Sequence, residues 1–182
     1  MKKVSLFLAD GFEEIEAVAT MDVLRRAGIA VETVSITGMS PVTGAHGIVV
    51  NADTLFEAAI FDDSDMLVLP GGMPGTLNLQ NHSGLKDVLI NFDNKRKFIA
   101  AICAAPLILG ELGMLEGREA TVYKGYEEHL LGADYDASSL KLDGHILTAA
   151  GPYWTINFAL SIVAILLGKN KAELLCYEMQ GT

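Results

Sequence analysis

The chain has 182 residues, is 51% hydrophobic and carries a formal net charge of −10, which favours one folded domain over residues 1–182 rather than a disordered chain. The acidic balance argues against a nucleic-acid partner, because phosphate recognition needs clustered Lys and Arg, and no apolar run reaches the roughly 20 residues of a membrane span. Two cysteines far apart, without the Cys/His spacing of a zinc site, indicate reduced thiols in a cytoplasmic protein, with no disulfide framework and no metal.

The predicted elements alternate between strands and helices along the chain. An apolar run that ends at Asp10-Gly11 predicts the first strand, and the helix after it has acids in its first turn. Apolar residues cover most of this helix's circumference, which predicts burial on two sides and makes a partner subunit a candidate for the second side. The predicted strands are 4–9, 31–36, 47–51, 65–72, 98–102, 120–123, 140–142 and 146–149, and the predicted helices are 13–27, 82–97, 105–112, 152–167 and 169–179.

Continuously apolar strands between helices predict a parallel sheet that is covered on both faces. The exception is the pair of strands around Asp143-Gly144, a strong hairpin signal. In parallel folds of this kind the functional site lies beyond the carboxyl ends of the strands. Three such ends are conspicuous here: Asp10-Gly11, Gly71-Gly72 and Cys103.

Cys103 follows a predicted strand in the segment Ala101-Ile-Cys-Ala-Ala105, and small residues on both sides are typical of a nucleophile elbow. The free N–H groups at the start of the next helix favour a thiolate. The alternative is an inert buried cysteine, since free Cys is among the most buried residue types. Cys176, on the last predicted helix, is interpreted as structural.

The Gly71-Gly72 pair ends a strand in a segment that can approach a ligand closely with its backbone. Together with the N–H of Ala104, the N–H of Gly72 would form an oxyanion hole. An ordinary turn is the alternative for the glycine pair.

Three acids begin the first predicted helix. Helix-start electrostatics explains Glu13 and Glu14, whereas Glu16 can turn inward toward the strand ends. A carboxylate beside a thiol predicts one shared proton and coupled titration. Protonated Glu16 would donate a hydrogen bond to the Cys103 sulfur and could shuttle protons.

The segments "ADGFEEIEAV", "LPGG" and "AAICAAP", in this order, resemble the ThiJ/PfpI superfamily, in particular the branch of the parkinsonism-associated protein deglycase and its bacterial relatives. The later "LTAAGP" and "FALSIVAILLGK" extend the resemblance over most of the chain. It implies a flavodoxin-like three-layer α/β sandwich that forms a homodimer through the first helix.

The resemblance also implies residue roles. Cys103 matches the reactive, oxidation-prone cysteine, Glu16 the acid hydrogen-bonded to it, and Gly72 and Ala104 the oxyanion-hole donors. The activities implied are cofactor-free glyoxalase III chemistry (methylglyoxal to lactate), deglycation of glyoxal adducts, redox sensing in oxidative stress and chaperone-like protection.

Several positions depart from the family pattern. Tyr123 stands where the family often has a His after the cysteine, and His46 replaces an Arg near the site. His129 remains an acid/base candidate on a predicted solvated turn. The segment Gly151-Pro-Tyr153-Trp154 replaces the family's Gly-Pro-Gly-Thr, so these aromatic residues, with Tyr123, His46 and Gly71, are candidates to line and reshape the pocket.

Four functions follow as hypotheses. The first is a glyoxalase III-like or deglycase-like lyase or hydrolase acting on a small reactive aldehyde or a glycated adduct, without metal or cofactor. The second is a redox-sensing or stress-protective protein in which Cys103 oxidises to a sulfinate. The third, a cysteine peptidase or amidase, is disfavoured because Tyr123 replaces the expected His. The fourth is a chaperone-like dimer in which the cysteine is incidental.

Overall fold

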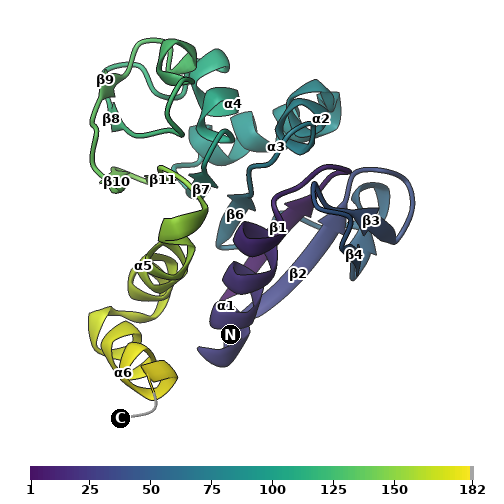
Figure 1. The fold of residues 1–182 in the computed structure, drawn as a ribbon, viewed down its shortest axis with the longest axis vertical. Helices are drawn as coiled ribbons and strands as arrows, with labels where there is room; N and C mark the ends of the chain where they lie inside the picture. Colours follow the sequence, from purple (N-terminus) through teal and green to yellow (C-terminus); the bar gives the residue numbers. More distant parts are fainter. Residues whose placement is uncertain (181–182) are drawn as a thin grey trace.

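The computed structural model describes residues 1–180 and is an α/β fold (Figure 1). The main sheet contains β1 (Lys3–Leu8), β2 (Ala30–Ser35), β5 (Thr54–Leu55), β6 (Met66–Leu69), β7 (Phe98–Ile102), β10 (Leu140–Asp143) and β11 (Ile146–Ala149). Two small sheets pair β3 (Pro41–Thr43) with β4 (Val49–Asn51) and β8 (Glu119–Ala120) with β9 (Asp134–Tyr135). The helices are η1 (Ile15–Ala19), α1 (Thr20–Arg26), α2 (Gly75–Asn81), α3 (Ser83–Asn94), α4 (Pro106–Glu111), α5 (Thr155–Leu167) and α6 (Lys169–Gln180), with short 3-10 turns η2 (Phe56–Ala58), η3 (Glu127–His129) and η4 (Pro152–Trp154).

The strand order of the main sheet is β10-β11-β7-β6-β1-β2-β5. All its pairings are parallel except that of β10 with β11, which confirms the predicted hairpin and the mostly parallel sheet. Because β1, β6 and β7 are neighbours and run in the same direction, the segments that follow them meet at one edge. The three strand ends identified in the sequence therefore lie side by side.

The sheet is covered on both faces, as the continuously apolar strands predict. One apolar cluster joins the sheet to α1, α5 and α6, and a second joins the opposite face to α2, α3 and α4. In β1 the neighbours Leu6 and Phe7 belong to different clusters, because successive side chains of a strand point to opposite faces. These three layers confirm the expected flavodoxin-like sandwich.

Some predicted elements were wrong or incomplete. The predicted strand 47–51 forms only β4, and β4 pairs with β3 in a separate hairpin and does not join the main sheet. The strand predicted over 120–123 is the two-residue β8, and helix α2 was not predicted. These segments are short and lie among glycines, so the period of two or 3.6 residues has too few repeats to be read.

The first predicted helix forms as η1 followed by α1, and η1 is a π-helical turn. Its inner side is buried through Ala17, Val23 and Leu24. Ile15 and Val18 are 57% and 37% exposed, so residues 1–180 leave these side chains on the second side of the helix uncovered. No helix within residues 1–180 is both long and apolar enough to cross a membrane.

Candidate functional site

Cys103 stands directly after β7 in a left-handed backbone conformation, with a φ of 63°. Such a φ is uncommon for any residue other than glycine and costs about 1–3 kcal/mol, so the surrounding structure must impose it. Two hydrogen bonds do so: the Cys103 N–H donates to the Ala149 carbonyl at 2.8 Å, and the Tyr123 N–H donates to the Cys103 carbonyl at 2.8 Å. The sharp turn between strand and helix is the geometry expected of a nucleophile elbow.

Glu16 reaches the elbow from η1. Glu16 is only 1% exposed, and its Oε2 accepts a hydrogen bond from the Gly71 N–H at 2.7 Å. A Cβ on Gly71 would lie 2.6 Å from the Cβ of Cys103 and 2.8 Å from Oε2 of Glu16. The absence of a side chain at Gly71 therefore lets the acid and the thiol approach each other.

The charges of this pair are coupled. Burial raises the pKa of Glu16 to about 7, against the opposing hydrogen bonds from Gly71 and Cys103. Burial also raises the pKa of the Cys103 thiol, and the negative charge of Glu16 raises it further. The sequence predicted that N–H groups would favour the thiolate, but burial and the charge of Glu16 outweigh these groups and keep the pKa of Cys103 above its ordinary value.

The backbone N–H groups of Ala104 and Gly72 act in the opposite direction and lower the pKa of Cys103. Gly72 has a φ of 93°, and a Cβ there would collide with the Glu13 nitrogen, so only glycine fits the turn that aims this N–H. The two N–H groups predicted as oxyanion-hole donors thus both favour negative charge on the sulfur. The arrangement can stabilise negative charge on the sulfur or on an oxygen bound next to it.

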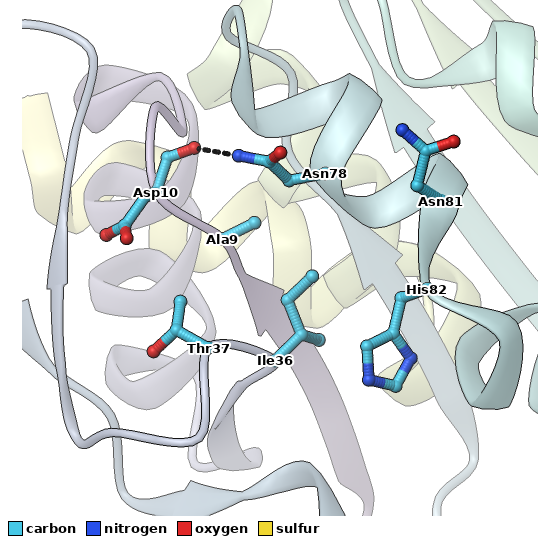
Figure 2. A pocket seen from close by; sticks show the side chains of 7 residues that line it. All are labelled: Ala9, Asp10, Ile36, Thr37, Asn78, Asn81 and His82. Carbon is cyan, nitrogen blue, oxygen red and sulfur yellow. Dashed lines mark hydrogen bonds between the residues drawn. The ribbon is translucent and has the colours of Figure 1, made fainter.

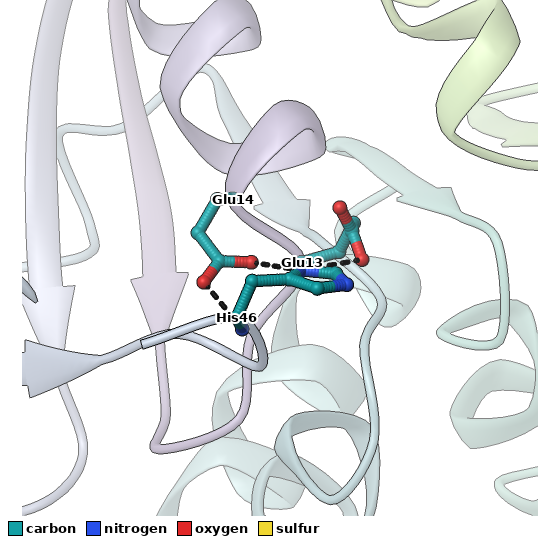
Figure 3. Close-up of side chains that lie close together, drawn as sticks. All are labelled: Glu13, Glu14 and His46. Atoms are coloured by element: carbon teal, nitrogen blue, oxygen red, sulfur yellow. Dashed lines mark hydrogen bonds and ion pairs between the residues drawn. The ribbon is translucent and has the colours of Figure 1, made fainter. Parts of the chain in front are cut away.

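Glu14 has a role that the sequence analysis missed. It is 5% exposed, and its Oε1 accepts hydrogen bonds from the N–H groups of His46 at 2.6 Å and Ile48 at 3.4 Å. Its Oε2 lies 2.8 Å from Nδ1 of His46 (Figure 3). Glu14 thereby fastens the β3–β4 hairpin to the start of η1. No sequence signal distinguished it from Glu13, since two acids at a helix start look alike until the hairpin is placed.

Glu13, Glu14 and His46 are also the residues that could hold a metal ion, because one ligand atom from each lies within 4.8 Å of the others (Figure 3). Both oxygens of Glu14 are already engaged by His46 and Ile48, however. The cluster is therefore explained as a hairpin anchor. His46 was predicted to line the pocket, but its imidazole forms a hydrogen bond with Glu14 instead.

The remaining predicted residues fall into two groups. Tyr123, Tyr153 and Trp154 line one pocket next to the elbow, together with Lys124, Ala150, Gly151 and Pro152. His129 lies apart from them on η3, where its Nδ1 is 3.7 Å from Oε1 of Glu111. The structure brings Cys103, Glu16, Gly71, Gly72 and Ala104 together and leaves His129 near the surface with an acid.

A second pocket lies at the carboxyl ends of β1 and β2 (Figure 2). It is lined by Ala9, Asp10, Ile36, Thr37, Asn78, Asn81 and His82. The Asn78 amide donates to the Asp10 carbonyl at 2.8 Å, and Nδ1 of His82 accepts from the N–H of Leu85 at 3.0 Å. None of the residues predicted for the site lines this pocket.

Comparisons with known proteins give a consistent result. Residues 2–165 match the model of the DJ-1/PfpI family. Protein DJ-1 homolog A of Arabidopsis thaliana is 40% identical over 94% of this chain, which spans only 45% of that protein's length. The Parkinson disease protein 7 homolog of Danio rerio is 35% identical over 94% of this chain and 93% of its own length. The solved structure of oxidized Toxoplasma gondii DJ-1 superposes with a TM-score of 0.95 at 32% identity, covering 99% of this chain and 98% of that one.

Proposed function

The chain belongs to the DJ-1/PfpI family, and we propose that it is a cofactor-independent, cysteine-dependent enzyme that converts 2-oxoaldehydes to 2-hydroxy acids, with methylglyoxal to lactate as the reference reaction. The observation that carries the proposal is that buried Glu16 and Cys103 flank Gly71, each within 2.8 Å of where a Gly71 Cβ would lie, at a strained elbow. A thiol alone would serve many purposes. A buried acid with a pKa of about 7 next to it supplies a proton carrier that is matched to neutral pH.

The proposed steps balance without an external oxidant or reductant. When Glu16 holds the shared proton, the Cys103 thiolate attacks the aldehyde carbon and forms a C–S bond. The N–H groups of Gly72 and Ala104 donate to the oxygen that becomes negative. Glu16 gives its proton to this oxygen and, now a carboxylate, removes the proton from the former aldehyde carbon, which leaves an enediolate. The hydroxyl proton passes to the oxygen of the neighbouring carbon and Glu16 returns its proton to that carbon itself, so the first carbon is oxidised to a thioester carbonyl and the second is reduced to a carbinol. Water breaks the C–S bond of the resulting thioester and releases the hydroxy acid and the thiol.

A second candidate function is redox sensing in stress protection. Cys103 is only partly buried, so peroxide can reach it, and the same N–H donors would stabilise a sulfinate. A stress-protective or deglycase role of the DJ-1 type also agrees with the relatives. A peptidase or amidase is not proposed, because Tyr123 occupies the position where a His would be needed and His129 lies beside Glu111.

A homodimer is proposed as the working form. Exposed Ile15 and Val18 on η1 form an apolar face next to the helix turn that carries Glu16. Burying such side chains against a second copy would stabilise the pair. This contact would also fix the position of Glu16.

The test is methylglyoxal consumption by purified wild type and Cys103→Ser, without glutathione and with lactate quantified. Cysteine-dependent lactate formation is expected. If wild-type protein with reduced Cys103 forms no lactate, the proposed enzyme activity is refuted and redox sensing remains as the candidate function. Cys176→Ser is the matched control and should form lactate at the wild-type rate.

A further inference from the structure

The pocket beside the elbow is attached to Cys103 through both of its walls. One wall begins at Tyr123, whose N–H donates to the Cys103 carbonyl at 2.8 Å. The other wall, 150–154, follows Ala149 directly, and the Ala149 carbonyl accepts from the Cys103 N–H at 2.8 Å. The pocket has a volume of about 360 Å³, within the range of small-molecule sites. A group bound there would lie next to the elbow backbone.

The walls of this pocket are held in place by their own contacts. A Cβ on Gly151 would lie 3.0 Å from Cδ2 of Tyr123, so the tyrosine ring rests against the bare glycine backbone. The Trp154 N–H donates to the Gly151 carbonyl at 2.9 Å, and the ring of Trp154 meets that of Tyr153 edge-on at 5.1 Å. Tyr123 and Trp154 are therefore held in place before a ligand binds, which reduces the ordering cost of binding, whereas Tyr153 is 85% exposed.

The chemistry of the lining is aromatic and apolar. Tyr123, Tyr153 and Trp154 contribute rings, Pro152 adds an apolar ring, and no acidic side chain lines the pocket. Lys124 is its single charged residue. Aromatic rings bind other flat apolar groups well in offset or edge-on geometry, beyond the benefit of the buried area. A methyl group would leave most of this surface in water.

We infer that this pocket selects 2-oxoaldehydes in which the ketone carries an aromatic ring, so that aryl-substituted 2-hydroxy acids are the preferred products. The inference rests on the proposed function and specifies its substrate class. The aldehyde reacts at Cys103 while the ring occupies the space between Tyr123 and Trp154. The bonds made and broken are those of the reference reaction, with an aryl group in place of the methyl.

The kinetic test compares phenylglyoxal with methylglyoxal, quantifying mandelate and lactate as products. We expect kcat/KM to favour phenylglyoxal by about tenfold or more, since burying several carbons in an apolar pocket is worth that much. Trp154→Ala should reduce this ratio by about tenfold, and Trp154→Phe, which keeps a ring, should restore most of it. Tyr177→Ala removes an exposed tyrosine on α6, outside the pocket, and should leave the ratio unchanged.

A binding test is independent of turnover. Trp154 is the only tryptophan of the chain, so intrinsic tryptophan fluorescence reports from the pocket. In a Cys103→Ala protein, mandelate should change this fluorescence saturably and lactate should not. Tyr123→Ala in the same background should weaken mandelate binding, whereas Tyr177→Ala should not.

The two tests separate the inference from the function on which it rests. Cysteine-dependent lactate formation without a preference for phenylglyoxal, and without saturable mandelate binding, would overturn the inference and leave the proposed function standing. If mandelate binds in a Tyr123-dependent way but neither aldehyde is turned over, the proposed enzyme activity is refuted. The inference that the pocket binds aromatic ligands is then supported. Absence of both turnover and binding would refute both.

Discussion

Glu16 and Cys103 meet over Gly71, at a position where any side chain would lie 2.6 Å from the Cβ of the cysteine and 2.8 Å from an oxygen of the acid. The Gly71 N–H also donates to that oxygen at 2.7 Å. A single glycine thus both leaves room for the pair and orients its acid.

Glu16→Gln should change how stability depends on pH. Burial raises the pKa of folded Glu16 from 4.5 to about 7, so its stabilising contribution is complete below pH 4.5 and is lost as the pH rises through about 7. The loss amounts to about 3 kcal/mol at most. Urea unfolding between about pH 5 and pH 8 should therefore show a falling free energy of unfolding for wild type and a flatter one for Glu16→Gln.

The same variant should also lose lactate formation, because the amide cannot carry the shared proton. Glu57→Gln changes an exposed carboxylate and should behave as wild type in both measurements. Equal pH slopes for wild type and Glu16→Gln would show that the buried carboxylate does not hold a proton at neutral pH.

Gly71→Ala should disrupt the pair. The new methyl group must push apart Glu16 and Cys103, and a displacement of about 1 Å near reacting groups costs on the order of a hundredfold in rate. Gly28→Ala is the control, since a Cβ there meets nothing within 4 Å and its φ of 85° adds only local strain. Kinetics and thermal unfolding of both variants would distinguish lost geometry from lost stability. Normal turnover in Gly71→Ala would remove the glycine from the mechanism.

Cys103 should be the oxidised cysteine at low peroxide. The Ala104 and Gly72 N–H groups favour a negative charge on its sulfur, whereas the Cys176 sulfur on α6 has the side-chain amide of Gln180 as its donor, at 3.7 Å. Mass spectrometry of digested protein should show a gain of two oxygens on the Cys103 peptide first. Preferential oxidation of Cys176 would contradict this assignment.

Glu14→Ala should release the β3–β4 hairpin. The variant loses the hydrogen bonds from His46 and Ile48, with an expected cost of about 2 kcal/mol or more. Burial opposes ionisation, but the hydrogen bonds from His46 outweigh it and hold the pKa of Glu14 below 4.5. This contribution is therefore complete above pH 4.5 and is lost as the pH falls through the lower folded value.

Hydrogen exchange measures the hairpin directly. The amides of His46 and Ile48 should exchange faster in Glu14→Ala than in Glu57→Ala, which changes an exposed residue. Unchanged protection in Glu14→Ala would show that the hairpin is held by its own β3–β4 pairing.

Val18→Glu should prevent the proposed dimer, because a charge would have to be buried in the apolar contact. Light scattering of the eluting protein should give the mass of two chains for wild type and of one chain for the variant. Leu174→Glu changes a residue on α6 that is 51% exposed and should remain dimeric. A wild-type protein that elutes with the mass of one chain would refute the dimer.

The sequence by itself determined the layered α/β class and the edge of the sheet where the chemistry lies. Continuous apolar strands such as β1, β6 and β7 imply burial on both faces, and neighbouring parallel strands bring Asp10, Gly71 and Cys103 to the same edge. Small residues around Cys103 predicted a tight turn, which the φ of 63° matches. Each of these features depends on residues that are neighbours in the sequence, so it can be predicted without knowing the tertiary structure.

Only the tertiary structure shows the different roles of the acids at the start of the first helix. Glu14 and Glu16 belong to one short acidic segment, yet one anchors a hairpin and the other meets the thiol. Their directions depend on the π turn of η1 and on where the hairpin and Gly71 lie across from it. The pocket of Tyr123 and Trp154 likewise exists only because two distant segments both bond to the backbone of Cys103. Contacts between distant segments depend on how whole helices and strands pack, and the spacing of apolar residues within one segment does not predict this packing.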